Sequence, residues 1–170
     1  MKYRKVEHDA TLKIVGKVLF QGHGKISIGS NVKIYSRWDK NPVGGGTGKT
    51  VLQTIGSGCI RIGSNSGLSH VTIVSRQSVT VGDNVLLGGG VQIYDNDFHP
   101  INWQHRSDDS EIKSLPVIIE DNAFIGANSI VLKGVRIGNG SVVGAGSVVT
   151  KSIPENEIWA GNPAKFVKKL

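Results

Sequence analysis

The chain is dominated by a repeat of six residues that is unbroken from Ile119 to Ile153. An aliphatic residue returns at every sixth position, and the fourth residue after each is mostly small. The aliphatic positions are Ile119, Ile125, Val131, Ile137, Val143 and Val149. Neither the helical period of about 3.6 residues nor simple strand alternation produces this spacing. The repeat therefore limits the chain to a stacked, repetitive fold.

A second pattern shows how the hexapeptides are grouped. Two aliphatic residues separated by one residue, and followed by Gly or Glu, recur at Ile26/Ile28-Gly29, Ile60/Ile62-Gly63, Val79/Val81-Gly82, Val117/Ile119-Glu120 and Val135/Ile137-Gly138. The last two copies are 18 residues apart, so three hexapeptides make one turn. We predict an all-β fold of about five or six triangular coils, with inward aliphatic residues on each side and turns at the corners.

Two stretches break the period and are predicted to project from the coil as loops. Residues 38 to about 54 interrupt the first coil, and residues 95 to about 116 interrupt the third. Long insertions in a repetitive scaffold are often functional. Near the end of the chain, Asn162-Pro163 offers an N-cap followed by proline, so residues 163–170 are predicted to form a short helix. All of these parts are expected to belong to one domain, residues 1–170.

The charge balance bears on the kind of partner. The formal net charge is +7, which favours an anionic partner. No aromatic residues are interleaved with a basic stripe and no nucleic-acid-binding motif is recognisable, so a phosphorylated small molecule is preferred to nucleic acid. No stretch approaches the roughly 18 apolar residues of a membrane span, and the first residues lack the apolar run of a signal peptide. We therefore expect a soluble, cytoplasmic protein.

The whole pattern resembles the hexapeptide-repeat acyltransferases, from about Ile26 to the C-terminus. The most specific matches are the repeat over residues 119–153, VGAGSVVTK at 143–151, WAGNPAK at 159–165, and Asp97-Phe98-His99-Pro100 in the second insertion. Together they resemble the sugar and polysaccharide O-acetyltransferases near the maltose and galactoside acetyltransferases. The resemblance implies a left-handed parallel β-helix, which is an exception to the right-handed crossover rule. It also implies a homotrimer with acetyl-coenzyme A (acetyl-CoA) in the groove between neighbouring subunits.

The second insertion holds the residues expected to act on the acceptor. Acetyl transfer to an alcohol needs a base, a group that stabilises the oxyanion, and alignment of both substrates. His99 matches the catalytic histidine of the family's loop motif, so we predict that it is the general base. Asp95 and Asp97 could orient the imidazole or bind acceptor hydroxyls, although turn chemistry would also explain them. Trp103 could stack on a sugar ring or fill the trimer interface.

The resemblance also carries coenzyme-binding positions over to this chain. Ala127 matches a position near the thioester, and its backbone N–H or that of Gly126 could serve the oxyanion. Ala145 matches a position whose backbone meets the pantetheine arm. Simple packing in the coil would also explain both alanines. The positions near the adenine and phosphates are matched by Thr150, Lys151, Lys165 and Lys168, whose ammonium groups attract anionic oxygens.

Two other features suggest different chemistry and are set aside. GGGTGKT at residues 44–50 resembles a phosphate-binding loop, but the required first glycine falls on Val43 and no helix is expected to follow. We interpret it as a Gly-rich loop near Arg37, Trp38 and Lys49, which could help to receive an acceptor. Together with His99, the histidines His70 and His105 suggest a second enzyme class with the same β-helix, the zinc carbonic anhydrases. Their spacing does not match that of the zinc ligands in that class, so no metal is expected.

The sequence therefore predicts an enzyme, an acetyl-CoA-dependent O-acetyltransferase acting on a sugar hydroxyl of a polysaccharide precursor or oligosaccharide. No covalent intermediate is expected, because the single Cys59 lies outside the candidate loop. One alternative is an N-acetyltransferase acting on an amino sugar. Another is a non-catalytic β-helix that serves as a scaffold.

Overall fold

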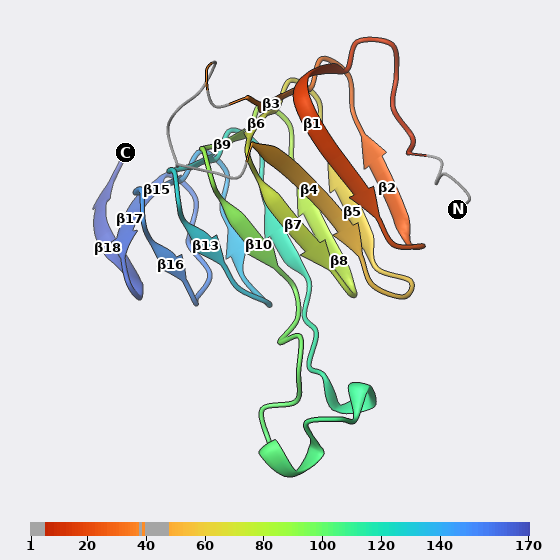
Figure 1. Ribbon diagram of the computed structural model, residues 1–170. Coiled ribbons are helices and arrows are strands. Elements are labelled where there is room, and N and C mark those ends of the chain that lie inside the picture. Colours follow the sequence, from red (N-terminus) through yellow and green to blue (C-terminus); the bar gives the residue numbers. More distant parts are fainter. Residues whose placement is uncertain (1–5, 38, 40–47) are drawn as a thin grey trace.

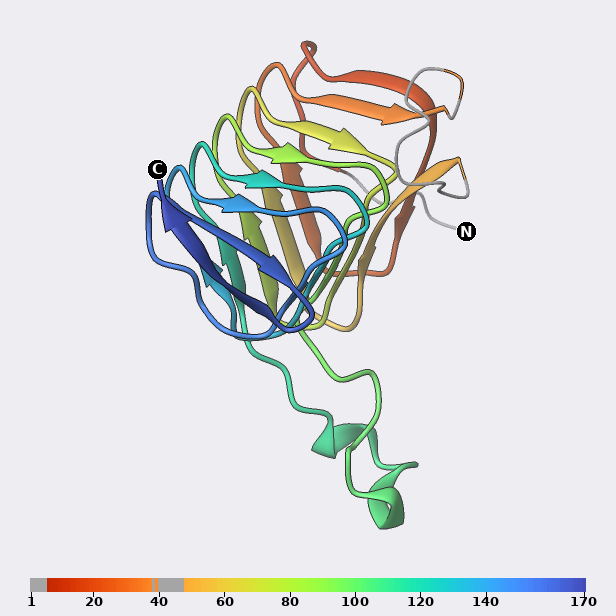
Figure 2. The ribbon, with the colours of Figure 1, turned by 90° about the vertical axis from the view of Figure 1, so that its left-hand side faces the viewer.

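The computed structural model describes residues 6–37, 39 and 48–170. This part of the chain winds as a left-handed parallel β-helix, the fold class that the repeat predicts. Its strands form three faces (Figure 1), and Figure 2 looks along the stack from the C-terminal end. Among the described residues, no helix has the length and apolar character needed to cross a bilayer.

The chain visits the three faces in a fixed order, A, B and then C. Face A consists of β2 (Lys25–Ile28), β5 (Cys59–Ile62), β8 (Ser78–Val81), β11 (Val117–Ile119) and β14 (Arg136–Ile137). Face B contains β3 (Lys33–Ser36), β6 (Gly67–Ser69), β9 (Leu86–Leu87), β12 (Phe124–Ile125), β15 (Val142–Val143) and β17 (Glu157–Gly161). Face C contains β4 (Lys49–Thr54), β7 (Thr72–Ser75), β10 (Gln92–Tyr94), β13 (Ile130–Val131) and β16 (Val148–Val149). β1 (Lys13–Gln21) spans two faces, pairing first with β3 and then with β4.

The hexapeptide positions form the core. Each strand pairs in parallel with its equivalent one coil later, so that Ile125 lies against Val143 and Val131 against Val149. The six aliphatic residues of the unbroken repeat are all buried. Burying a side chain of this size contributes about 1.5–3 kcal/mol, so the stacked rows account for the stability of the coil.

The corners between faces are called the A–B, B–C and C–A edges here. At the A–B edge, Asn31, Asn65, Asn84 and Asn122 have φ angles of 57° to 60°. Asparagine tolerates this left-handed conformation better than most residues. Asn31 also donates a hydrogen bond to Asn65 of the next coil, 3.2 Å away. These repeated turns make successive corners stack.

The insertions leave the coil at two different edges. Residues 95–116 project from the C–A edge between β10 and β11 (Figure 1) and contain two short 3-10 helices, η1 (Trp103–His105) and η2 (Asp109–Glu111). The other insertion lies at the B–C edge between β3 and β4. Its predicted end near residue 54 is wrong, because Lys49–Thr54 form β4 and pair with β1 and β7. Most of the Gly-rich stretch, residues 43–47, and Trp38 lie outside the described residues.

The misplaced end of the first insertion has a physical cause. The inward positions of β4 include Thr50 and Thr54, which are 0% and 2% exposed, rather than aliphatic residues. The hydroxyl of Ser36 donates to Thr50 Oγ1 at 2.7 Å, so the polar groups are satisfied inside the coil. A strand with polar residues at its inward positions is therefore not predicted from the aliphatic repeat.

The predicted terminal helix is also wrong. Residues Ala164–Lys169 form β18, which pairs antiparallel with β17 and places Trp159 opposite Phe166. Asn162 and Pro163 occupy the turn between the two strands instead of starting a helix. Eight residues make a marginal helix, whereas the free edge of β17 offers β18 a row of backbone partners.

Candidate active site

The predicted site residues lie at two opposite edges of face C. Gly126, Ala127 and Ala145 lie at the B–C edge, in the corners that precede β13 and β16. The C–A edge, or the insertion that leaves it, holds Asp95, Asp97, His99, Trp103, Thr150 and Lys151. A strand of about four residues separates the two edges by roughly 13 Å, whereas reacting atoms must approach to about 3–3.5 Å. One copy of the chain therefore does not bring His99 to Ala127.

Gly126 is needed for close packing of the coils. A Cβ atom at this position would lie 2.5 Å from the backbone nitrogen of Ala145 in the next coil. The Gly126 N–H donates to the carbonyl of Val143 at 2.7 Å. It is therefore not available to an oxyanion, which removes one of the two donors considered from the sequence.

Ala127 and Ala145 leave their backbone N–H groups open. Neither group donates a hydrogen bond to any acceptor in the described part of the chain. Ala127 is half-buried and Ala145 is exposed, and they occupy equivalent corners of consecutive coils, roughly 4.8 Å apart. The B–C edge thus presents a short row of backbone donors, which suits carbonyl or oxyanion ligands.

Buried serines hold this edge in place. Ser129 Oγ and Ser147 Oγ both donate to the carbonyl of Gly144, at 3.0 Å and 2.6 Å. Ser147 Oγ also accepts from the Gly161 N–H at 3.0 Å, which ties the corner to the end of β17. These are the small positions of the hexapeptide, so the repeat supplies the hydrogen bonds that fix the row of donors.

Asp95 has a structural position at the root of the second insertion. It is completely buried, and its carboxylate accepts from Ser75 Oγ, Asn96 Nδ2 and the backbone N–H groups of Arg76 and Gln77, at 2.7 to 3.1 Å. These four bonds use the oxygens that an acceptor would need. Asp95 therefore fixes the turn after β7, and the expected contact with acceptor hydroxyls does not fit this geometry.

Asp97 pairs with a residue that the sequence did not single out. Its Oδ1 lies 2.5 Å from Lys133 Nζ at the end of β13, and both side chains are mostly buried. Its other oxygen, Oδ2, is buried with no hydrogen-bond partner among the described residues. The two residues are 36 positions apart, so no local sequence signal links them. Asp97 therefore anchors the insertion.

The backbone before His99 is held by several contacts. The His99 N–H donates to the Asp97 carbonyl at 2.7 Å, and Phe98 has a φ of 61°. The Phe98 ring meets the Tyr94 ring edge to face, with centroids 5.1 Å apart. Burial raises the pKa of Tyr94, whose protonated hydroxyl donates to Gln92 at 2.6 Å. The His99 side chain is exposed, and its ring has no hydrogen-bond partner among the described residues.

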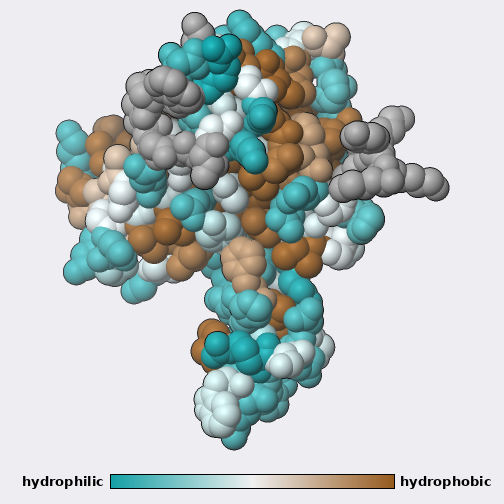
Figure 3. All heavy atoms as spheres, viewed as in Figure 1, coloured by the Kyte–Doolittle hydropathy of each residue, from teal (hydrophilic) through white to brown (hydrophobic). Residues whose placement is uncertain are grey.

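The outer part of the insertion reaches away from the coil. Ile101 and Trp103 are 74% and 75% exposed, although most of the insertion surface is hydrophilic (Figure 3). His105 Nδ1 lies 2.5 Å from Glu111 Oε1. His70 is buried at the B–C edge, so His70, His99 and His105 do not converge within one copy. No three His, Cys, Asp or Glu side chains form a possible metal site within the described ranges.

The predicted phosphate-binding residues are also divided between elements. Thr150 and Lys151 are exposed at the C–A edge, directly after β16. Lys165 is exposed on β18 beside the turn that reaches the B–C edge, and Lys168 lies farther along the same strand. One copy again presents two partial sets of groups rather than a closed binding site.

Two sequence relationships bear on the family. Residues 54–95 and 116–151 match the model of the hexapeptide repeat of succinyl-transferase. The galactoside O-acetyltransferase of Escherichia coli is 39% identical over 112 residues, which are 65% of this chain and 54% of that enzyme. The chain spans between 36% and 56% of the length of such curated relatives.

Solved structures show the same similarity. A hexapeptide-repeat acetyltransferase of Vibrio cholerae, complexed with acetyl-CoA, is 34% identical with a TM-score of 0.59, over 65% of this chain and 60% of that one. AntD, an N-acyltransferase of Bacillus cereus in complex with dTDP and 3-hydroxybutyryl-CoA, is 26% identical with a TM-score of 0.74, over 94% of this chain and 80% of that one. The repeats of this chain thus match the hexapeptide repeat, and these similarities support the hexapeptide-repeat acetyltransferase family.

Proposed function

We propose that this protein is an O-acetyltransferase that moves an acetyl group from acetyl-CoA to a sugar hydroxyl. The exposed His99 on an anchored insertion, whose ring has no hydrogen-bond partner in the described part of its own copy, is the observation that carries this proposal. The named activities of the E. coli and V. cholerae relatives support the transfer of an acetyl group from acetyl-CoA. The acceptor is a polysaccharide precursor or an oligosaccharide.

The active unit is a homotrimer in which the site forms between two copies. His99 and the Ala127 N–H lie at opposite edges of face C, so each copy supplies half of a site. The insertion of one copy reaches the B–C edge of its neighbour, and the exposed Ile101 and Trp103 lose contact with water on assembly. Closed rings of identical copies are a common form of soluble oligomers.

His99 and Ala127 perform the chemical step. Acetyl-CoA supplies the acetyl group as a thioester. His99 accepts the proton of the acceptor hydroxyl while its oxygen forms a bond to the acetyl carbonyl carbon. The Ala127 N–H donates to the oxyanion that develops on the carbonyl oxygen. When the carbon–sulfur bond breaks, His99 returns the proton to the departing thiolate, and the ester and free thiol leave.

The coenzyme contacts are divided between the two copies. Ala145 lies one coil beyond Ala127, so its open N–H can bind an amide carbonyl of the pantetheine arm. The four exposed residues Thr150, Lys151, Lys165 and Lys168 serve the adenine and phosphates. The Trp103 ring stacks on the acceptor in this proposal, and Asp97, paired with Lys133, holds the segment that carries His99.

A second candidate is transfer to the amine of an amino sugar. AntD is named an N-acyltransferase, and its likeness extends over 94% of this chain. An amine needs less help from a base than a hydroxyl does, so the two candidates differ in their dependence on His99. The nature of the bond in the product separates them directly.

An acceptor screen tests the proposal. Sugars and amino sugars are incubated with acetyl-CoA and the protein, and loss of the thioester is followed by its absorbance so that Cys59 does not contribute a thiol signal. Mass spectrometry then distinguishes an ester, which hydroxylamine cleaves, from an amide, which it does not. Transfer only to amines would replace the O-transfer proposal with the second candidate. No transfer to any sugar, together with no thermal stabilisation by acetyl-CoA, would favour a scaffold.

A further inference from the structure

A hollow lies at the N-terminal end of the B–C edge, and its lining includes Arg37 and Lys49, which the sequence links to receiving an acceptor. It has a volume of about 760 Å³ and is lined by Gly16, Lys17, Ser36, Arg37, Asp39, Gly48 and Lys49. Ligand pockets commonly have volumes of about 300–1,000 Å³, so the hollow is large enough for a sugar with a charged substituent.

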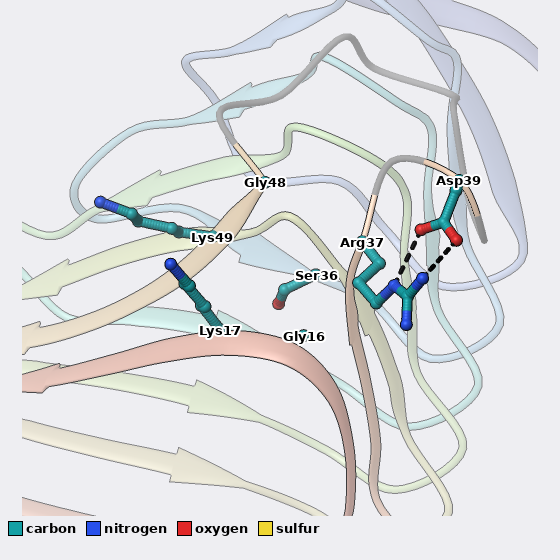
Figure 4. Close-up of a pocket in the computed structure, with 7 residues that line it drawn as sticks. All are labelled: Gly16, Lys17, Ser36, Arg37, Asp39, Gly48 and Lys49. Carbon is teal, nitrogen blue, oxygen red and sulfur yellow. Dashed lines mark hydrogen bonds and ion pairs between the residues drawn. The ribbon is translucent and has the colours of Figure 1, made fainter.

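Two lysines of this hollow are direct neighbours. Lys17 on β1 and Lys49 on β4 are in register on adjacent parallel strands. Figure 4 shows their side chains extending toward the same side. Neither ammonium group is paired with a carboxylate in residues 6–37, 39 and 48–170. Like charges at directly opposed positions destabilise a sheet, and an anion bound between them would relieve the repulsion.

The third cation of the hollow is already partnered. Arg37 donates from Nε and a terminal nitrogen to the two oxygens of Asp39, at 2.9 Å and 2.6 Å. This pair lies across the hollow from the lysines (Figure 4). Among the described residues, the lining therefore holds three cations and one carboxylate, and the charges that are not balanced are those of Lys17 and Lys49.

The hollow is aligned with the proposed coenzyme groups. Arg37 and Gly48 border the B–C edge in the coil of β3 and β4, and Ala127 lies at the same edge three coils later. With a strand spacing of about 4.8 Å, the two places are roughly 14 Å apart. A molecule lying along this edge can reach both the transfer site and the hollow.

We propose that this hollow binds an oxyanion, a phosphate or a carboxylate, that the acceptor carries roughly 14 Å from the hydroxyl to be acetylated. Lys17 and Lys49 contact the anion as point charges, and the Arg37–Asp39 pair offers hydrogen bonds to neighbouring hydroxyls. The link to the acceptor rests on the proposed function. The anion site itself rests on the fact that Lys17 and Lys49, unpaired and in register, both line the hollow beside Arg37.

Calorimetric titration of the full chain with acetyl-CoA present tests the site, using glucose 1-phosphate, glucuronate and methyl glucoside as probes. The Lys17→Gln/Lys49→Gln variant is expected to bind the preferred anionic probe roughly tenfold more weakly, as the loss of two exposed charge contacts allows. Binding of the neutral methyl glucoside should not change. Affinity for the anion should also fall as salt is raised, because exposed charges are screened.

A matched control comes from the same coil. Lys13 and Lys33 are another in-register pair on β1 and β3, equally exposed but outside the hollow, so Lys13→Gln/Lys33→Gln removes the same net charge. This control should bind the anionic probes as the unaltered protein does. Selective loss of glucose 1-phosphate identifies a phosphate site, and selective loss of glucuronate identifies a carboxylate site. Equal binding by both double variants, or no binding of either anion to the unaltered protein, would overturn the proposal.

The acceptor screen keeps this inference separate from the proposed function. If the anions bind through Lys17 and Lys49 but no acetyl transfer occurs, the anion site stands and the proposed function fails. If neutral sugars are acetylated and the lysines do not affect anion binding, the proposed function stands and the anion site fails.

Discussion

Lys133 and Asp97 join the projecting insertion to the coil. The lysine ammonium at the end of β13 lies 2.5 Å from the Asp97 carboxylate, two residues before His99. The side chains are 24% and 19% exposed, so the pair is shielded from solvent far better than a surface ion pair. The position of the proposed base therefore depends on a residue from another coil.

The Lys133→Met variant should loosen the root of the insertion. Removing the ammonium leaves a mostly buried carboxylate without its partner, and the backbone N–H groups near Asp97 should exchange hydrogen about tenfold faster. Mass spectrometry of the peptide containing residues 94–100 measures this rate. Lys113→Met, which removes an exposed charge from the same insertion, serves as the control. Unchanged exchange in Lys133→Met would show that the pair does not hold the insertion.

Asp95→Ala should destabilise the protein without a specific effect on acceptor affinity. The substitution leaves the N–H groups of Arg76 and Gln77 without their acceptor, which should cost about 2–4 kcal/mol of unfolding free energy. Urea denaturation measures this cost. Asp108→Ala, at an exposed N-cap in the same insertion, should cost about 1 kcal/mol. A folded Asp95→Ala protein with a raised KM for the acceptor alone would restore the acceptor-binding role.

His99→Ala should remove most transfer activity and little else. Loss of a general base lowers kcat by about 10²–10⁴, whereas the exposed side chain contributes little to stability. Acetyl-CoA should still raise the Tm of the variant. His105→Ala removes a second exposed histidine of the insertion and should keep near-normal activity. Wild-type transfer by His99→Ala would eliminate the general-base assignment.

Two inactive variants should complement each other if sites form between copies. Ala145→Trp places a large side chain at an exposed position of the B–C edge and should block the coenzyme, while His99→Ala lacks the base. In oligomers reassembled from equal amounts of both chains, about a quarter of the sites combine an intact His99 with an intact edge. Transfer should recover to that extent. Absence of any recovery in verified mixed oligomers would contradict the two-copy site.

Gly126→Ala should destabilise the coil because the added methyl group does not fit between two consecutive coils. The new Cβ would meet the Ala145 backbone at 2.5 Å, and separating the two coils should cost about 3 kcal/mol. Gly56→Ala is the matched control, because its φ is 57° and nothing lies within 4 Å of the added atom. It should cost about 1 kcal/mol from backbone conformation alone. Thermal unfolding of both variants compares the two costs, and equal values would argue against tight contact at Gly126.

The sequence predicts the coil because the core requires an aliphatic residue at every sixth position. The aliphatic residue at every sixth position from Ile119 to Val149 is buried, since each side of a stacked coil turns this position inward. The aliphatic pattern does not predict a strand where a polar residue occupies the inward position. Thr50 satisfies its hydroxyl inside the first coil, so β4 carries no aliphatic signal at that point.

The contacts of the candidate site are harder to predict from a local sequence pattern than the coil is. His99 can be assigned from a short motif, but Asp95 and Asp97 look alike in the sequence and differ entirely in their surroundings. Asp95 is enclosed by the turn after β7, and Asp97 faces Lys133. Both environments arise from residues about one or two coils away in the chain. Contacts of that range depend on how the coils stack, which a local pattern does not record.

The strand that replaces the expected terminal helix keeps the stack finite. A pile of parallel strands could continue indefinitely, because each new rung leaves its own backbone donors and acceptors ready for another chain. β18 runs antiparallel across the last coil and presents Lys165, Lys168 and Lys169, all exposed. Their mutual repulsion disfavours the docking of a second copy end to end, so the lysines proposed to attract phosphates also protect the protein from growing into a fibre.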